Sequence, residues 1–270
     1  VKLEMNKIRS SKNIPTHLRL VISKEDIGNV VADKLGIPTN IVNESEMEKL
    51  KRLDADLKTR IIWQNEAVEA RVKTLTRNRM SVMHKSKPIW SFLFLGPSGV
   101  GKTYLAKLIA KDYFGDETAM IRIDMSEFME KYSVSKLIGS PAGYVGYDEW
   151  GNLTEAVRRK PYSVLLFDEV EKAATDVLNI LLQILDEWQL KDAKGRLIDF
   201  KNTIIIMTSN IGSEEFSKKQ STIWFATSEK KDIDKKQFEI IKERVMEEVK
   251  NFLSPELLNR ISYKIVFSHL

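Results

Sequence analysis

The chain has 270 residues, of which 43% are hydrophobic and 30% charged, and its formal net charge is +5. This composition is ordinary for a globular protein, and the absence of cysteine excludes disulfides and thiolate metal sites. With only three scattered histidines, a zinc site is improbable. No apolar stretch has the length of a membrane span. The chain has no block of five or six like charges, so its charge pattern gives little support for binding to nucleic acid. We therefore expect neither a membrane nor nucleic acid as a partner, and a reducing cytoplasm is compatible with the composition.

Residues 1–43 are polar with scattered apolar clusters, and we interpret them as a linker or the tail of an upstream domain. Residues 44–270 form the second region, which opens with two amphipathic helical patterns. Their apolar positions are Met47, Leu50, Leu53 and Leu57 in the first, and Val68, Val72 and Leu75 in the second. Packing against the core is the expected use of both patterns.

The segment Gly96–Thr103 reads Gly-Pro-Ser-Gly-Val-Gly-Lys-Thr and is typical of a loop that binds a nucleoside triphosphate. The apolar run Phe92–Leu95 predicts a strand before it, and Thr103–Phe114 has helical spacing with Gly115 as its stop. Glycines let backbone N–H groups surround phosphates at a helix N-terminus, while Lys102 reaches the outer phosphates and Thr103 can hold Mg²⁺. The sequence therefore predicts ATP and Mg²⁺ as ligands.

Further strands are predicted at four places along the remaining chain: Met120–Ile123, Val164–Asp168, Thr203–Thr208 and Tyr263–Phe267. Strands that alternate with helical stretches indicate a parallel sheet covered by helices on both faces. Ligands of such sheets bind at the carboxyl ends of the strands, where Lys102, Asp168 and Asn210 would meet. In a hydrolytic site Asp168 would belong to the metal shell, and Glu169 would polarise the attacking water.

Five motifs together extend this prediction beyond a generic phosphate loop. They are Gly143–Tyr147 (GYVGY), Leu153–Arg159 (LTEAVRR), Asp168–Ala173 (DEVEKA), Ile206–Asn210 (IMTSN) and Leu258–Ile261 (LNRI). From about Glu25 to Leu270 the chain resembles the second ATPase module of Clp-type AAA+ unfoldases, ClpC above all. The resemblance implies the AAA+ P-loop NTPase fold: an α/β large subdomain with a five-stranded parallel sheet sandwiched by helices. The chain stops at Leu270, so the family's small helical subdomain is expected to be missing, with weak hydrolysis and weak ring formation as the result.

The resemblance also implies a role for each residue that matches a family motif. Glu169 would be the catalytic base, Asn210 the sensor of the γ-phosphate and water, and Arg260 the arginine finger, with Lys102 also catalytic. Thr103 and Asp168 would hold the metal. Nucleotide contacts would come from Gly96, Pro97, Ser98, Gly99, Val100, Gly101, Lys102, Thr103, Tyr104 and Ile62.

The same resemblance implies three partners. An arginine finger acts on a neighbouring subunit, so a homo-oligomeric ring is expected, hexameric in the family. Tyr144 and Val145 would form a pore loop that grips unfolded polypeptides, since glycines let the loop move and an aromatic ring contacts any sequence. Ile223 and Phe225 would dock on a ClpP-type peptidase.

All five tryptophans of the chain stand where the resembling family usually has glycine: Trp63, Trp90, Trp150, Trp188 and Trp224. Trp188 follows Asp186 and Glu187 at the end of a helical pattern, a place where left-handed backbone is common and glycine is favoured. Glycine and tryptophan codons can differ by one nucleotide (GGA and UGA), so one interpretation is that the source reads UGA as glycine and that the sequence was translated with UGA as tryptophan. The other is five genuine tryptophans packed as apolar groups. A single UGG codon among the five would exclude the first as a general account.

Three alternative functions follow from the same residues. A ClpB-like disaggregase would release its substrate without a peptidase, and the Ile223–Phe225 segment separates it from the peptidase-coupled unfoldase. A phosphate-loop ATPase acting on DNA would account for the excess of basic over acidic residues. It would need a basic or hairpin element that contacts DNA, and the chain has Gly143–Gly146 instead. A non-hydrolysing regulatory fragment is disfavoured because four residues are intact: Lys102, Asp168, Glu169 and Arg260. The expected location is cytoplasmic, with an organelle stroma or matrix as the alternative.

Overall fold

The computed structural model describes residues 22–35, 90–141, 143, 151–214 and 230–267. The chain divides into two compact units, Val1–Glu44 and Ser45–Leu270. No helix among the described residues is long and apolar enough to cross a membrane. The two amphipathic patterns predicted between residues 44 and 75 lie outside the described residues.

The first unit contains the helix α2, Lys24–Leu35, within the segment that the sequence indicated to be a linker or tail. Its start is fixed by a reciprocal cap. The backbone N–H of Asp26 donates to Ser23 Oγ at 3.1 Å, and the backbone N–H of Ser23 donates to Asp26 Oδ2 at 2.9 Å. These bonds satisfy N–H groups that the first helical turn leaves open. The Ser-x-x-Asp pattern was a local signal for this helix.

The second unit is built on a parallel sheet of five strands, as predicted. The strands are β1 Trp90–Leu95, β2 Met120–Asp124, β3 Val164–Asp168, β6 Ile204–Ser209 and β7 Tyr263–Val266. Their order across the sheet is β2-β3-β6-β1-β7, and every neighbouring pair is parallel. The phosphate-loop strand β1 thus lies between β6 and β7, and β6 separates it from β3.

Helices occupy the connections between these strands. Among its described residues, the unit has the α-helices α6 Lys102–Phe114, α7 Val134–Ile138, α8 Asn152–Arg159, α9 Thr175–Glu187, α11 Lys230–Phe252 and α12 Pro255–Arg260. Short 3₁₀ turns are η2 Glu117–Ala119, η3 Met125–Phe128, η4 Lys131–Ser133 and η5 Val170–Lys172. A small antiparallel hairpin, β4 Gln189–Lys191 with β5 Leu197–Asp199, follows α9.

One face of the sheet packs against α6 through aromatic side chains. Trp90 is 6% exposed, and its ring centroid lies 5.1 Å from that of Tyr113 in an edge-to-face arrangement. Phe92 stacks on Tyr263 of β7 with centroids 5.2 Å apart. Aromatic pairs stabilise beyond their buried area. The pair of Trp90 and Tyr113 therefore holds the C-terminal end of α6 on the sheet, and the pair of Phe92 and Tyr263 joins β1 to β7.

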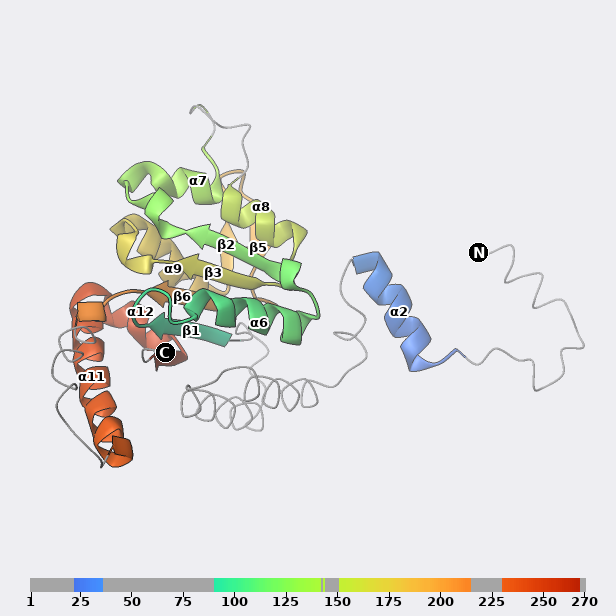
Figure 1. Ribbon diagram of the computed structural model, residues 1–270. Helices are drawn as coiled ribbons and strands as arrows, with labels where there is room; N and C mark the ends of the chain where they lie inside the picture. Colours follow the sequence, from blue (N-terminus) through green and yellow to red (C-terminus); the bar gives the residue numbers. More distant parts are fainter. Residues whose placement is uncertain (1–21, 36–89, 142, 144–150, 215–229, 268–270) are drawn as a thin grey trace, which may run out of the picture. The chain divides into compact units, whose positions relative to one another are not determined.

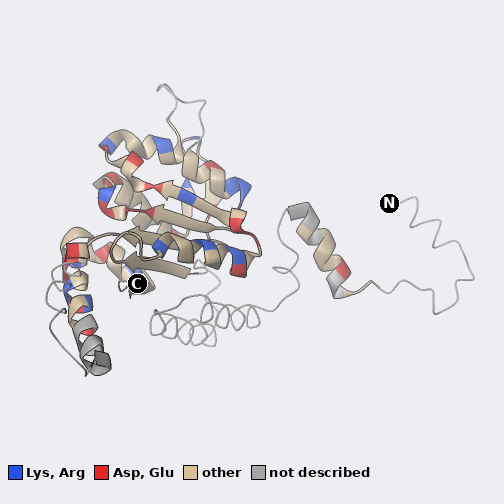
Figure 2. Ribbon diagram, viewed as in Figure 1, with Lys and Arg blue, Asp and Glu red and all other residues tan. Residues whose placement is uncertain are grey.

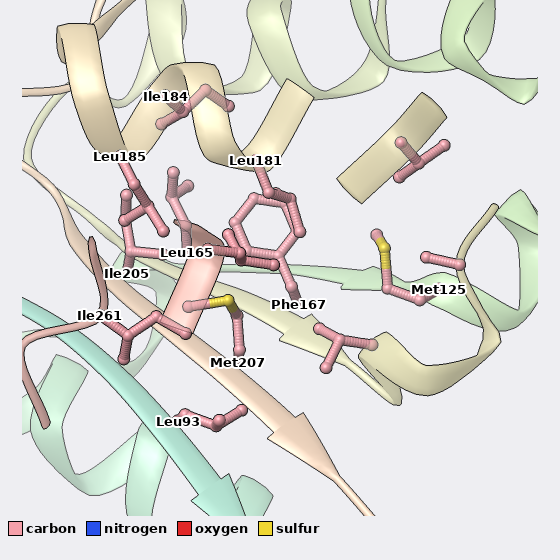
Figure 3. Packing of buried hydrophobic residues seen from close by; sticks show 14 of the residues in the cluster. Leu93, Met125, Leu165, Phe167, Leu181, Ile184, Leu185, Ile205, Met207 and Ile261 are labelled. Carbon is pink, nitrogen blue, oxygen red and sulfur yellow. The ribbon is translucent and has the colours of Figure 1, made fainter. Parts of the chain in front are cut away.

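The opposite face carries the main core, where α9 covers the central strands (Figure 3). Leu165 and Phe167 of β3 and Ile205 and Met207 of β6 alternate with the residues of the α6 face, as the two-residue period of a strand requires. They pack against apolar residues of α9, including Leu181. Both faces are therefore apolar, which explains why β3 and β6 are continuous hydrophobic runs.

The β4–β5 hairpin was not predicted from the sequence. Its strands have three residues each, and its turn depends on Asp192, which is buried. Asp192 Oδ1 accepts from the backbone N–H of Lys194 at 3.0 Å and of Arg196 at 2.8 Å. Strands this short give no hydrophobic period, so only the turn residues could have indicated the hairpin.

Trp188 ends α9 in left-handed backbone, with φ 61° and ψ 13°, which confirms the expectation for this position. Its backbone N–H donates to the Ile184 carbonyl at 3.0 Å. The side chain is half-buried against the core. Of the other tryptophans only Trp90 is described, so the remaining three positions lie outside the described residues.

These two tryptophans should respond differently to replacement by glycine. Trp90→Gly is expected to lower the free energy of unfolding by about 3–5 kcal/mol, because it empties a buried site beside Tyr113. Trp188→Gly should change it by less than about 1.5 kcal/mol, because relief of left-handed strain, about 1–2 kcal/mol, offsets the lost contacts. Urea denaturation followed by circular dichroism measures both, and equal losses at the two positions would contradict this account.

Candidate functional site

The phosphate-loop segment follows β1 and leads directly into α6. Gly96 has φ 143°, and a Cβ there would lie 2.9 Å from the Phe267 carbonyl oxygen, so the backbone passes too close to Phe267 for another residue. Gly101 precedes α6 with φ 91°, a conformation that glycine adopts without strain. The loop therefore presents backbone N–H groups at the positive end of α6, where anions bind.

Lys102 is the first residue of α6 and is 8% exposed. Its Nζ donates to the carbonyls of Gly96 at 2.5 Å and Pro97 at 2.7 Å, and to Asn210 Oδ1 at 2.8 Å. Burial lowers the pKa of this ammonium, while the charges of Glu171, Asp168 and Glu169 act in the opposite direction. All three protons of the ammonium have acceptors, so its charge is held at a fixed point beside the loop.

The two acidic residues at the end of β3 both contact Thr208 of the neighbouring strand β6. Asp168 is 7% exposed, and its Oδ1 accepts a hydrogen bond from the Thr208 hydroxyl of β6. Its Oδ2 accepts from Arg122 Nε of β2 at 3.0 Å. Glu169 has left-handed backbone with φ 58°, and its N–H donates to Thr208 Oγ1 at 3.1 Å. This sparsely populated conformation is of the kind found where a side chain must be aimed at a site.

Asn210, directly after β6, links the lysine to the carboxylates. Its Oδ1 accepts from Lys102, and its Nδ2 donates to Glu169 Oε1 at 3.1 Å. Its backbone N–H donates to Glu171 Oε1 at 3.0 Å. The other oxygen of Glu171 is buried without a hydrogen-bond partner in the described part of the chain. Asn210 is therefore fixed at three points, which places its amide between Lys102 and Glu169.

These residues surround a cleft of about 280 Å³ at the carboxyl ends of the strands. Its lining residues are Ser98, Gly99, Gly101, Lys102, Thr103, Tyr104, Asp168, Glu169 and Asn210. The structure thus brings together a phosphate loop, a buried cation, two carboxylates and an amide, drawn from three strands and one helix. Clefts at this end of an open parallel sheet are the usual ligand sites of the fold.

A divalent cation fits this donor set only in part. The described residues contain no group of three or more histidine, aspartate or glutamate side chains that could hold a metal. The Thr103 hydroxyl and the Asp168 carboxylate line the same cleft and offer two oxygen ligands. Mg²⁺ typically takes one or two protein oxygens and completes its shell with phosphates and water. The residues therefore fit an ion that arrives with a phosphate chain.

Arg260 is not among the residues that line the cleft. It ends α12, and its Nη2 lies 3.0 Å from Asp186 Oδ1 at the end of α9. Both side chains are about half exposed, at 52% and 49%. The Arg260 guanidinium therefore lies at the surface, where it pairs with the Asp186 carboxylate.

Ile62, Tyr144, Val145, Ile223 and Phe225 lie outside the described residues. The structure does describe the two ends of the segment that contains Tyr144. A Cβ at Gly151 would lie 2.3 Å from the Leu137 carbonyl oxygen, so the start of α8 touches the end of α7. Glycine is needed at this contact because any side chain would meet backbone atoms.

Sequence reasoning missed four side chains that the geometry shows to hold the predicted ones: Arg122, Glu171, Asp186 and Thr208. Arg122 had a signal, because it is a charged residue inside the otherwise apolar run Met120–Ile123. The period of a strand places it on the same face as Asp124, at the edge beside β3.

Comparison with known proteins gives consistent matches. The profile of the family "AAA domain (Cdc48 subfamily)" matches residues 87–264. A ClpA homologue named as an ATP-binding subunit of the ATP-dependent Clp protease, from Cyanidium caldarium, is 49% identical over the whole chain, which spans 32% of that protein. The ClpC ATP-binding subunit from Staphylococcus aureus (strain USA300) is 50% identical over 96% of the chain and 31% of its own length. The chain therefore spans about a third of these relatives.

Solved structures give the same result for the fold. The S. cerevisiae Hsp104-ADP complex superimposes with a TM-score of 0.75 and 43% identity, over 98% of this chain and 42% of that one. A closed state of Hsp104 with ATPγS and FITC casein gives a TM-score of 0.71 and 44% identity, over 90% of this chain and 40% of that one.

Proposed function

We propose that the chain hydrolyses ATP and uses the energy to unfold polypeptides, because it belongs to the AAA domain family (Cdc48 subfamily). Within that family it is a Clp-type AAA+ ATPase module. Family membership implies nucleotide binding. The observation that carries the proposal for hydrolysis is the convergence of Lys102, Asp168, Glu169 and Asn210 on one cleft beside the phosphate loop.

In the proposed site the phosphate chain of ATP lies along the loop Gly96–Thr103, where backbone N–H groups at the start of α6 contact its oxygens. Lys102 then exchanges its loop carbonyls for the outer phosphates, and its charge offsets the negative charge that develops during transfer. Mg²⁺, held by Thr103 and Asp168, would neutralise further charge on the phosphate oxygens.

Glu169 is the proposed general base. A water molecule attacks the γ-phosphorus, and its proton passes to the Glu169 carboxylate as the bond to the β-phosphate oxygen breaks. The Asn210 amide supports this role, because it already holds Glu169 Oε1 at 3.1 Å and contacts Lys102 on its other side. An amide in that position can orient both the γ-phosphate and the attacking water.

Arg260 is proposed to act in the site of a neighbouring subunit. It lies at the surface beside Asp186 and does not line its own cleft. A finger supplied in trans requires a head-to-tail arrangement of copies, and closure of that arrangement gives a ring. We therefore propose a homo-oligomeric ring, hexameric as the resemblance implies.

The proposed substrates are unfolded polypeptides, gripped by Tyr144 and Val145 in the ring pore. The solved Hsp104 structure that contains casein supports a polypeptide substrate for this fold. Relatives named as subunits of a Clp protease support delivery to a ClpP-type peptidase through Ile223 and Phe225. A disaggregase without peptidase is the alternative, since the two Hsp104 structures, 44% and 43% identical to the chain, are not named as parts of a protease.

An ATPase acting on DNA is disfavoured by the distribution of charge. Figure 2 shows Lys and Arg interspersed with Asp and Glu along α11, and the same holds in its sequence, Glu239 to Lys250. Binding to a phosphate backbone calls for a face or stripe of one sign. The absence of cysteine is compatible with the cytoplasmic location that we propose.

Replacement of Lys102 by alanine tests the nucleotide site. We expect the affinity for a fluorescent ATP analogue with Mg²⁺ to fall about 10–100-fold, because charge-assisted hydrogen bonds to the phosphates are lost. Fluorescence titration measures the affinity. Lys107→Ala, an exposed lysine on the same helix, is the matched control and should bind as the parent does. Equal affinity of Lys102→Ala and the parent would overturn the site.

A further inference from the structure

Arg122 is a cation inside β2 that reaches across to β3. Its Nε lies 3.0 Å and its Nη2 2.7 Å from the same oxygen of Asp168, Oδ2. Nη2 also lies 3.6 Å from Asp124 Oδ2. The Arg122 side chain is 52% exposed and that of Asp168 is 10% exposed, so the buried member of the ion pair is Asp168. Burial of Asp168 strengthens the pair relative to an exposed one.

The hydrogen bonds of Asp168 leave its carboxylate nearly saturated. A carboxylate offers about four acceptor positions, two on each oxygen. Arg122 takes two on Oδ2, and the Thr208 hydroxyl takes one on Oδ1. One position on Oδ1 stays available to the cleft. Asp168 can therefore contact one ligand without any change in its contacts to Arg122.

Arg122 also changes the balance of charge at the site. Glu171, Asp168 and Glu169 all act electrostatically on Lys102, which is the cation of the cleft. Without Arg122, Lys102 alone would oppose three carboxylates, and a bare divalent cation would be attracted to the excess. The guanidinium cancels part of that excess at Asp168, the acid that would meet the ion.

We propose that Arg122 is a positioning residue that makes cation binding at Asp168 depend on the nucleotide. It leaves Asp168 one acceptor position and offsets part of its negative charge, so that a divalent cation enters with a phosphate chain, whose oxygens supply the missing ligands and negative charge. The inference rests on the proposed function, because it takes the cleft to be a site for a nucleotide and its cation. It assigns Arg122 no contact with either one.

Mn²⁺ binding without nucleotide tests the proposal directly. Arg122→Ala should bind Mn²⁺ roughly 5–20-fold more tightly than the parent, as followed by the EPR signal of free Mn²⁺, because a like charge is removed and two acceptor positions are freed. A merely structural arginine would leave the affinity unchanged or weaken it. Arg122→Lys keeps the charge and should stay within about threefold of the parent.

Two further variants locate the effect. Arg122→Ala combined with Asp168→Asn should lose the gain, because the added affinity runs through Asp168. Arg158→Ala removes an arginine of similar exposure that pairs with Glu155 on α8, and it should leave Mn²⁺ affinity unchanged. Thermal unfolding by circular dichroism establishes that each variant is folded. A folded Arg122→Ala protein with unchanged or weaker Mn²⁺ affinity would overturn the proposal.

The same variants also allow the effect of the cation on nucleotide affinity to be measured. The gain in affinity for a fluorescent ATP analogue on replacing EDTA by Mg²⁺ should be smaller in Arg122→Ala than in the parent, since coupling between two ligands is reciprocal. A parent chain that binds no nucleotide would refute the proposed function. The Mn²⁺ titration needs no nucleotide and would still decide the role of Arg122.

Discussion

Replacing Glu169 by glutamine is expected to lower ATP turnover about 10²–10⁴-fold, while the affinity for ATP stays within about threefold of the parent. Glutamine keeps an oxygen that can accept from Asn210 Nδ2, so the hydrogen bond at 3.1 Å survives and the cleft keeps its shape. What is lost is the group that takes the proton from the attacking water. Steady-state phosphate release and fluorescent-nucleotide titration, run on the same preparations, measure the two quantities.

Glu117→Gln is the control for this experiment, because Glu117 is an exposed carboxylate that pairs with Lys111 at the far end of α6. It should keep the turnover of the parent. A second expected consequence is that the Glu169→Gln protein retains ATP and polypeptide together, since binding continues and release after hydrolysis does not. Undiminished turnover in Glu169→Gln would show that another group is the base.

The sheet and the phosphate loop could be predicted from the sequence because their signals are local. The strand predicted at Val164–Asp168 has the bounds of β3, and the one predicted at Thr203–Thr208 is displaced by one residue from β6, Ile204–Ser209. Both strands are buried on both faces in the structure. Gly96 to Thr103 carries its own conformational requirements, since glycines occur where φ is positive. In each case the pattern of neighbouring residues indicates the element without tertiary information, although the close approach of Phe267 adds a tertiary reason for glycine at Gly96.

The contacts that position the catalytic side chains could not be predicted in this way. Arg122 and Asp168 are 46 positions apart, and Thr208 and Asp168 are 40 apart. Which of many charged residues meet depends on the strand order β2-β3-β6 and on the register Asp124 to Asp168. Neither the strand order nor the register can be recognised from a pattern in a single sequence. The pair of Asp186 and Arg260, from two helices, is hidden for the same reason.

Replacing Arg260 by alanine should lower ATP turnover by about 10³–10⁵-fold in the assembled protein, the range measured for arginine fingers. Arg260 pairs with Asp186, and a half-exposed ion pair contributes about 0–1 kcal/mol, so the fold should be little affected. Nucleotide affinity should also stay near that of the parent, because Arg260 does not line the cleft of its own chain. Phosphate release, nucleotide titration and urea denaturation measure the three expectations.

Mixing two inactive variants separates a finger that acts in trans from a structural role. Arg260→Ala subunits keep Glu169, and Glu169→Gln subunits keep Arg260, so a site between one of each, in the right order, has both groups. In a ring assembled at random from equal amounts, about a quarter of the sites are complete, and turnover should recover toward that fraction. An arginine that served only its own subunit would give no recovery, because no subunit in the mixture would carry both groups. A site is complete only when the subunit that supplies Glu169 is the Arg260→Ala variant and the neighbour that supplies Arg260 is the Glu169→Gln variant, so the recovered fraction measures action of Arg260 in trans.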